Sequence, residues 1–168
     1  MHILVAPNAF KNSLTATAAA EAIRDGLIES GLKSTIQCFP IGDGGDGTAS
    51  LIVKQLGGFF IDAEAHNPLG RKINTSIGFV DEGKTAVIEM ANVSGLKLLK
   101  EKEPDPMHAN SFGCGELIRL ALHHGAQKII LGVGGSATID GGCGALQAMG
   151  VRFLDRSKNE IAPAPENL

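Results

Sequence analysis

The stretch of residues 35–56, TIQCFPIGDGGDGTASLIVKQL, decides the fold class. Its first part, Thr35–Phe39, has the β-branched and apolar residues typical of a strand, and Thr48–Leu56 has the pattern of a helix that ends at the following glycines. The same order occurs upstream, where we expect a strand over His2–Ala6 and a helix over Thr15–Ser30. Because strand, loop and helix follow one another twice, the sequence predicts an open α/β fold with a parallel, Rossmann- or flavodoxin-like sheet.

The pattern changes after residue 58. Apolar and polar residues alternate over Phe59–Ala65 and again over Ile73–Phe79, and the segment Asn67–Gly70 (NPLG) between them has turn chemistry. With the returning segment Thr85–Met90, this pattern predicts an antiparallel hairpin. Further along the chain we expect a surface loop at 101–106 (EKEPDP), helices over Glu116–His124 and Gly142–Met149, and strands over Lys128–Val133 and Val151–Leu154. We therefore predict two α/β domains, residues 1–66 and residues 67–168, with the sheet of the first left incomplete.

Composition excludes several classes of function. The net charge of −3 and the absence of basic runs argue against a nucleic-acid partner. The sequence has no stretch of 18 apolar residues, so no membrane span is indicated, and the N-terminus lacks the features of a signal peptide. The three cysteines, Cys38, Cys114 and Cys143, form no C-x-x-C pair, so neither a zinc site nor a disulfide framework is indicated. We therefore expect a cytoplasmic protein with reduced cysteines. The sequence leaves the oligomeric state open, and a dimer is one of the possible states.

Two loops that follow expected strands carry residues suited to an anionic ligand. Residues 7–14 (PNAFKNSL) offer Lys11, and residues 42–48 (GDGGDGT) offer Asp43 and Asp46 beside the backbone N–H groups of a helix start. Carboxylates repel phosphate unless a metal ion lies between them, and Mg²⁺ prefers one or two carboxylates plus phosphate oxygens. A surface lysine and an ordinary helix cap are the alternative interpretations.

A third loop, residues 131–144 (LGVGGSATIDGGCG), follows the expected strand near residue 130. Residues 132–137 satisfy the loose dinucleotide fingerprint G-x-G-x-x-A, and Asp155 lies roughly where a ribose-binding acid is expected. However, the glycines continue beyond the point where a dinucleotide-binding helix begins, which favours a nest of N–H groups for an anion with Asp140 directed at a metal ion or a hydroxyl. A tight glycine-rich connection is the alternative. Together the three loops indicate phosphoryl transfer, which depends on positioning and charge neutralisation.

Six motifs also occur in the order seen in a known family: APNAFKNSLTA, PIGDGGDGT, NPLG, IEMANVSGL, DPMHANSFGCGELI and GVGGSATIDGGCGALQAMG. On these motifs, residues 1 to about 155 resemble bacterial glycerate kinases of the type I family. The resemblance implies ATP- and Mg²⁺-dependent phosphorylation of D-glycerate, generally at the 2-hydroxyl to give 2-phosphoglycerate, and a fold in which residues 67–168 form an inserted domain. Family members are considerably longer, so the resemblance implies an N-terminal portion, which we expect to be weakly active or inactive alone. The chain departs from the family's usual residues at Asn8, Asp46, Cys114 and Ile139.

The resemblance also implies roles for individual residues. Lys11 pairs with a phosphate or with the substrate carboxylate, while Asp43 and Asp140 are candidates for metal binding or general base, not separately assigned; Asp46 is a further metal candidate. The implied substrate- and phosphate-binding residues are Ser94, Gly95, Ser111, Gly134, Gly135, Ser136, Thr138 and Arg71. For Ser94 and Ser111 the alternative interpretation is helix capping, and for Arg71 it is a charge at the edge of a strand. We interpret Glu89 as part of a buried network. A dinucleotide-binding oxidoreductase module and a non-catalytic folded fragment stay open as alternative functions.

Overall fold

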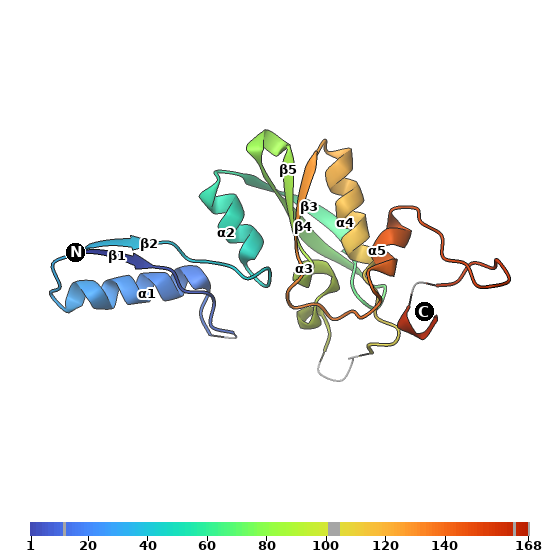
Figure 1. Cartoon of the computed structure of the whole chain (residues 1–168), viewed down its shortest axis with the longest axis horizontal. Helices are drawn as coiled ribbons and strands as arrows, with labels where there is room; N and C mark the ends of the chain where they lie inside the picture. The colour runs from blue at the N-terminus through green and yellow to red at the C-terminus, as the bar shows by residue number, and fades with distance from the viewer. Residues whose placement is uncertain (12, 101–104, 163, 168) are drawn as a thin grey trace. The chain divides into compact units, whose positions relative to one another are not determined.

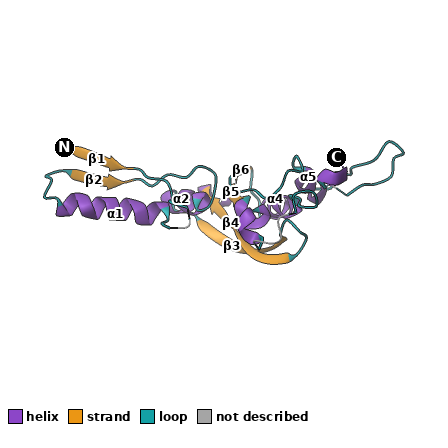
Figure 2. Cartoon of the chain, turned by 90° about the horizontal axis from the view of Figure 1, so that it is seen from below, coloured by secondary structure: helices purple, strands orange, loops and turns teal. Residues whose placement is uncertain are grey.

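The computed structural model describes residues 1–11, 13–100, 105–162 and 164–167, which fall into two compact units, Met1–Asp43 and Gly44–Leu168. In the first unit, strands β1 (His2–Val5) and β2 (Thr35–Cys38) pair in parallel, and helix α1 (Ala16–Glu29) connects them (Figure 2). The Thr15 side chain accepts a hydrogen bond from the N–H of Ala18 and caps α1, while Gly31 follows its end with a φ of 73°. The predicted β-α-β order and the parallel pairing are confirmed.

The second unit is built on a four-stranded mixed sheet with the order β3-β4-β5-β6. Strand β4 (Lys72–Val80) pairs antiparallel with both β3 (Phe59–His66) and β5 (Thr85–Glu89), whereas β6 (Lys128–Gly132) is parallel to β5. The helices of this unit are α2 (Thr48–Gln55), α3 (Ala91–Ser94), α4 (Phe112–His123) and α5 (Cys143–Ala148). Short 3₁₀ turns lie at Asp81–Gly83, Leu96–Leu98 and Pro165–Asn167. The α/β class and the predicted antiparallel hairpin are therefore confirmed.

Helices cover both faces of this sheet (Figure 1). On β5, Ala86 and Ile88 pack with Leu117 of α4, whereas Val87 between them packs with Val53 of α2. Side chains alternate between the two faces of a strand, so α2 and α4 lie on opposite sides of β5. Every residue of β5 is consequently buried, and the carboxyl ends of β5 and β6 lie side by side at one edge of the sheet.

Two sequence expectations differ from the structure. The strand expected over Val151–Leu154 is wrong, because those residues form no ladder and Leu154 makes only an isolated bridge with Glu160. Helix α4 begins at Phe112, a turn earlier than expected. Of the expected loop at 101–106, residues 101–104 lie outside the described residues.

The unit boundary after Asp43 also differs in place from the domain boundary predicted after His66. Pairing of β3 with β4 extends from Phe59↔Phe79 to His66↔Lys72, so both sides of the predicted boundary belong to one hairpin. The predicted domains of residues 1–66 and 67–168 stay a prediction.

Candidate functional site

Two glycine-rich loops of the second unit are in direct backbone contact. The N–H of Gly134 donates to the carbonyl oxygen of Gly44 over 2.9 Å. A Cβ on Gly132 would lie 2.6 Å from that carbonyl oxygen, and a Cβ on Gly134 would lie 2.7 Å from the Cα of Gly45. Real Cβ atoms essentially never come so close. These glycines are therefore needed because the loop after β6 packs against the loop that begins α2.

The loop after β6 also pairs with the segment that follows α3. Leu96 donates its N–H to the Gly135 carbonyl over 3.0 Å, and Ala137 donates to the Ser94 carbonyl over 2.9 Å. The Ser136 and Thr138 hydroxyl oxygens are 3.1 Å apart, and the N–H of Thr138 donates to the Ser136 hydroxyl. Because β5 and β6 are parallel, both segments start from the same edge of the sheet, which is where open α/β sheets bind ligands.

The structure thus brings together six of the predicted residues: Ser94, Gly95, Gly134, Gly135, Ser136 and Thr138. Within this group Ser94 differs from the others. Its side chain is fully buried, and its hydroxyl has no hydrogen-bond partner among the described residues. The half-buried hydroxyls of Ser136 and Thr138 are more accessible to a ligand.

Asp140 and Ser111 form a second, buried group where α4 and α5 begin. One carboxylate oxygen of Asp140 accepts hydrogen bonds from the Ser111 N–H and hydroxyl, each over 2.8 Å, and from the Gly144 N–H over 2.9 Å. The other oxygen accepts from the Gly142 N–H over 3.1 Å, and Asp140 is only 1% exposed. The Ser111 hydroxyl accepts in turn from the N–H of Ala145. This geometry ties the two helix starts together, and the predicted metal-binding or general-base role of Asp140 stays a prediction.

A network that includes Glu89 lies at the start of α2. Glu89, at the end of β5 and 5% exposed, accepts from the Ala49 N–H over 2.6 Å and from the Asn92 side-chain amide over 2.9 Å. Asn92 accepts in turn from Lys97, which forms an ion pair with Asp46. The buried-network interpretation of Glu89 is borne out by these contacts. Asn92 and Lys97 were missed, because no local pattern indicates them and Lys97 pairs with Asp46, which is distant in sequence.

The remaining predicted residues are not part of these two groups. Lys11 is exposed in the loop after β1, and Asp43 is the last residue of the first unit. Arg71 follows the turn at residues 67–70, in which the Asn67 side chain accepts from the Arg71 N–H. Their predicted roles stay predictions.

The loop after β6 lacks the geometry of a dinucleotide-binding motif. Such a motif opens a helix, but α5 begins only at Cys143, well beyond residues 132–137. Asp155, the candidate ribose-binding acid, accepts hydrogen bonds from Ser157 and from the backbone and side chain of Asn159. These contacts lower the pKa of its carboxyl and close a local turn.

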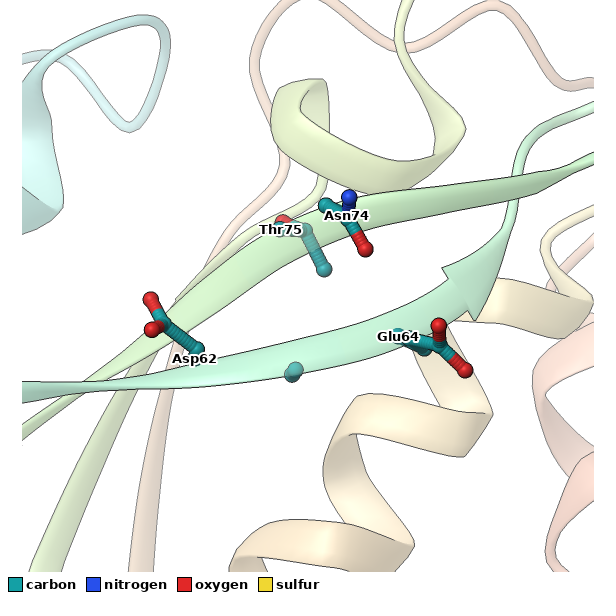
Figure 3. Close-up of a pocket in the computed structure, with 5 residues that line it drawn as sticks. Asp62, Glu64, Asn74 and Thr75 are labelled. Carbon is teal, nitrogen blue, oxygen red and sulfur yellow. The ribbon is translucent and has the colours of Figure 1, made fainter.

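An open cavity of about 510 Å³ lies on the β3–β4 hairpin, lined by Asp62, Ala63, Glu64, Asn74 and Thr75. Figure 3 shows the labelled side chains of Asp62 and Glu64 on one strand and of Asn74 and Thr75 on the other. None of them is a predicted site residue. Across the described ranges, no group of three or more His, Cys, Asp and Glu side chains is placed to hold a metal ion. In the same part of the chain, no helix combines the length and the apolar character that a membrane span requires.

An α/β chain with glycine-rich loops at the carboxyl ends of parallel strands has the architecture of proteins that bind small anionic ligands. The family can be named: the model of the glycerate kinase family matches residues 3–168, so the chain belongs to that family.

The names of individual relatives agree with this family. The chain is 44% identical over 163 residues to the glycerate kinase of Bacillus subtilis (strain 168), covering 97% of this chain and 43% of the relative. It is 44% identical over 161 residues to the glycerate 2-kinase of Escherichia coli (strain K12), and the match covers 96% of this chain and 42% of that relative. A crystal structure from Salmonella typhimurium LT2, of a protein provisionally named glycerate kinase 2, matches with a TM-score of 0.81 at 41% identity over 98% of this chain and 44% of that one. The chain therefore spans less than half the length of these relatives.

Proposed function

We propose that this chain is part of a glycerate kinase, which transfers a phosphoryl group from ATP, with Mg²⁺, to the 2-hydroxyl of D-glycerate to give 2-phosphoglycerate. The observation that carries the proposal is membership of the glycerate kinase family over residues 3–168. The relative named glycerate 2-kinase supports the choice of hydroxyl. We further propose that the protein acts in the cytoplasm on small molecules only.

The proposed chemistry requires charge neutralisation and positioning more than covalent reactivity. We assign Ser136 and Thr138, with the backbone around Gly135, to hydrogen bonding of an anionic group of the substrate. Lys11 supplies the positive charge that pairs with a phosphate or with the glycerate carboxylate. Asp140 holds the starts of α4 and α5 in place, since both of its oxygens are occupied by N–H and hydroxyl donors.

We assign the metal ion to Asp43 and Asp46, the second of which also pairs with Lys97. Mg²⁺ is usually bound in such sites by one or two carboxylates together with substrate phosphates, so the lack of a larger acidic cluster among the described residues fits ATP-bound Mg²⁺. When bound, the ion neutralises charge on the phosphates. Asp43 is also our candidate for accepting the proton of the attacking hydroxyl.

A chimera tests the function independently of the length of this chain. In the chimera, this chain replaces the matching 163-residue segment of the Bacillus subtilis relative, and the product formed from ATP and D-glycerate is identified by phosphorus NMR. We expect 2-phosphoglycerate to form. Lys11→Met should lower kcat/KM by about 100-fold or more, as for the loss of a preorganised charge partner. Lys33→Met, which removes another exposed lysine of the first unit, is the matched control and should have little effect.

Each alternative predicts a different result. A folded chimera that uses ATP only with other 2-hydroxy acids would refute the assignment of the substrate. Formation of 3-phosphoglycerate would refute the assignment of the hydroxyl. NAD binding that is lost in Asp155→Asn would favour the oxidoreductase module instead. A folded chimera without any turnover, beside an active Bacillus subtilis protein, would favour the non-catalytic fragment.

A further inference from the structure

Glu89 is a buried carboxylate that binds two different elements. Its Oε1 accepts from the N–H of Ala49 over 2.6 Å, and its Oε2 accepts from the side-chain amide of Asn92 over 2.9 Å. Burying a carboxylate is costly unless both oxygens find donors, and here both do. Glu89 therefore links the end of β5 to the start of α2 and to α3.

The position of Ala49 makes the first of these contacts informative. Ala49 lies in the first turn of α2, where free N–H groups and the helix dipole favour an anion. The carboxylate of Glu89 already satisfies this N–H, so the helix start is held by an internal anion. Next to it, the Thr48 hydroxyl accepts from the N–H of Gly44, which folds the preceding loop back onto the same helix start.

The second contact leads to the acidic residue of that loop. The Asn92 side-chain oxygen accepts from the Lys97 ammonium group over 2.6 Å, and Lys97 forms an ion pair with Asp46. Lys97 and Asp46 are 44% and 59% exposed, and such surface ion pairs contribute little alone. Glu89 is the buried residue in this series of contacts, so we expect it to determine how firmly Asp46 is held.

We propose that Glu89 is the positioning residue of the site. It fixes the loop Gly44–Thr48, with the Asp46 carboxylate, against the loop after β6, where the Gly44 carbonyl meets the Gly134 N–H. The catalytic part of this proposal rests on the proposed function, whereas the positioning itself is a property of the fold. Glu89 does not touch the substrate and acts through Ala49, Asn92 and Lys97.

Hydrogen exchange of this chain tests the positioning directly. Glu89→Gln keeps the size of the side chain but has one acceptor oxygen, so its NH₂ group faces either the Ala49 N–H or the Asn92 amide. We expect the amides of residues 44–49 to exchange about tenfold faster or more, as for the loss of one buried hydrogen bond to a charged group. Thr85→Val is the matched control, because the buried Thr85 donates a partly buried hydrogen bond to Asp81 over 2.7 Å at the other end of β5, and the change removes it. It should leave the exchange of these amides unchanged.

Kinetics of the chimera test the functional consequence. Glu89→Gln should lower kcat about tenfold or more while KM changes less than about threefold, because the loop is misplaced for the transition state more than for binding. Asn92→Ala, which keeps Glu89 and breaks only the link to Lys97, should lower kcat less. It remains informative if Glu89→Gln does not fold.

Three results would overturn the proposal. These are unchanged exchange of residues 44–49 in a folded Glu89→Gln variant, equal loss of kcat in Thr85→Val, and an Asn92→Ala variant indistinguishable from the parent in both assays. If the unsubstituted chimera does not phosphorylate D-glycerate, the proposed function fails, and the exchange experiment still decides whether Glu89 positions the loop.

Discussion

Replacing Asp140 by asparagine should destabilise the second unit by about 3 kcal/mol. The carboxylate accepts four hydrogen bonds, three of them on one oxygen, and it is 1% exposed. In the best orientation of the amide, its single oxygen keeps those three bonds, and its NH₂ group faces the N–H of Gly142. The change therefore keeps the volume of the side chain while removing its charge and one acceptor.

The magnitude follows from these contacts. A hydrogen bond to a charged group contributes about 1.5–3 kcal/mol and a neutral one about 0.5–1.5 kcal/mol, so three bonds lose about 1 kcal/mol each. An unsatisfied buried donor at Gly142 costs about 1–3 kcal/mol more. Part of the sum is offset because a neutral amide is less costly to bury than a carboxylate, which leaves about 3 kcal/mol.

Urea unfolding followed by far-UV circular dichroism measures the effect, since the chain has neither Trp nor Tyr as an intrinsic fluorophore. Hydrogen exchange at Ser111, Gly142 and Gly144 should increase in the same variant. Asp155→Asn is the matched control: Asp155 also accepts several hydrogen bonds, but it is exposed, and the loss should be much smaller. A loss below about 1 kcal/mol for Asp140→Asn, or equal losses for both variants, would refute the reasoning.

Three further outcomes are expected. Gly134→Ala should cost about 1–3 kcal/mol in urea unfolding, because its Cβ would lie 2.7 Å from the Cα of Gly45; unchanged stability would contradict the loop contact. His108 donates a hydrogen bond to Asp105, and this bond, followed by the charges of Asp105 and Glu166, raises the pKa of His108. The stabilisation from His108 is therefore complete below about pH 6.5 and is lost as the pH rises through the raised pKa. A pH series of unfolding midpoints for His108→Gln against the parent should converge at high pH, and a constant difference would contradict this. Burial raises the pKa of the Cys114 thiol to about 11, so mass spectrometry after thiol labelling of the folded chain at pH 8 should find Cys114 unmodified and the two partly exposed cysteines labelled.

Local signals predicted much of the fold. The helix expected over Thr15–Ser30 is α1 (Ala16–Glu29), and the turn residues at 67–70 placed the β3–β4 hairpin. The start of α4 was placed too late, because Gly113 and Gly115 resemble helix breakers in sequence. In the structure they allow close packing, since a Cβ on Gly113 would lie 1.9 Å from the His66 carbonyl oxygen and one on Gly115 would lie 2.2 Å from that of Ala145.

Candidate site residues could be chosen from local sequence patterns, but most of their contacts with distant segments could not be predicted. Ser136 and Thr138 were assigned to an anion-binding loop, and that loop lies at the edge where β5 and β6 end. The hydrogen bond between Asp140 and Ser111, for example, joins residues 29 positions apart, and no local pattern indicates it. The same holds for Glu89, whose partner Ala49 lies on α2, 40 residues away in the sequence.

The contact between the Gly44 carbonyl and the Gly134 N–H has a consequence for the order of folding. It joins segments that are far apart along the chain, and closing so long a loop costs entropy that only the paired β5 and β6 strands can offset. We therefore expect the two loops to come together after the parallel pair has formed, late on the folding pathway. On this order, the first helix and the hairpin form before the two glycine-rich loops meet.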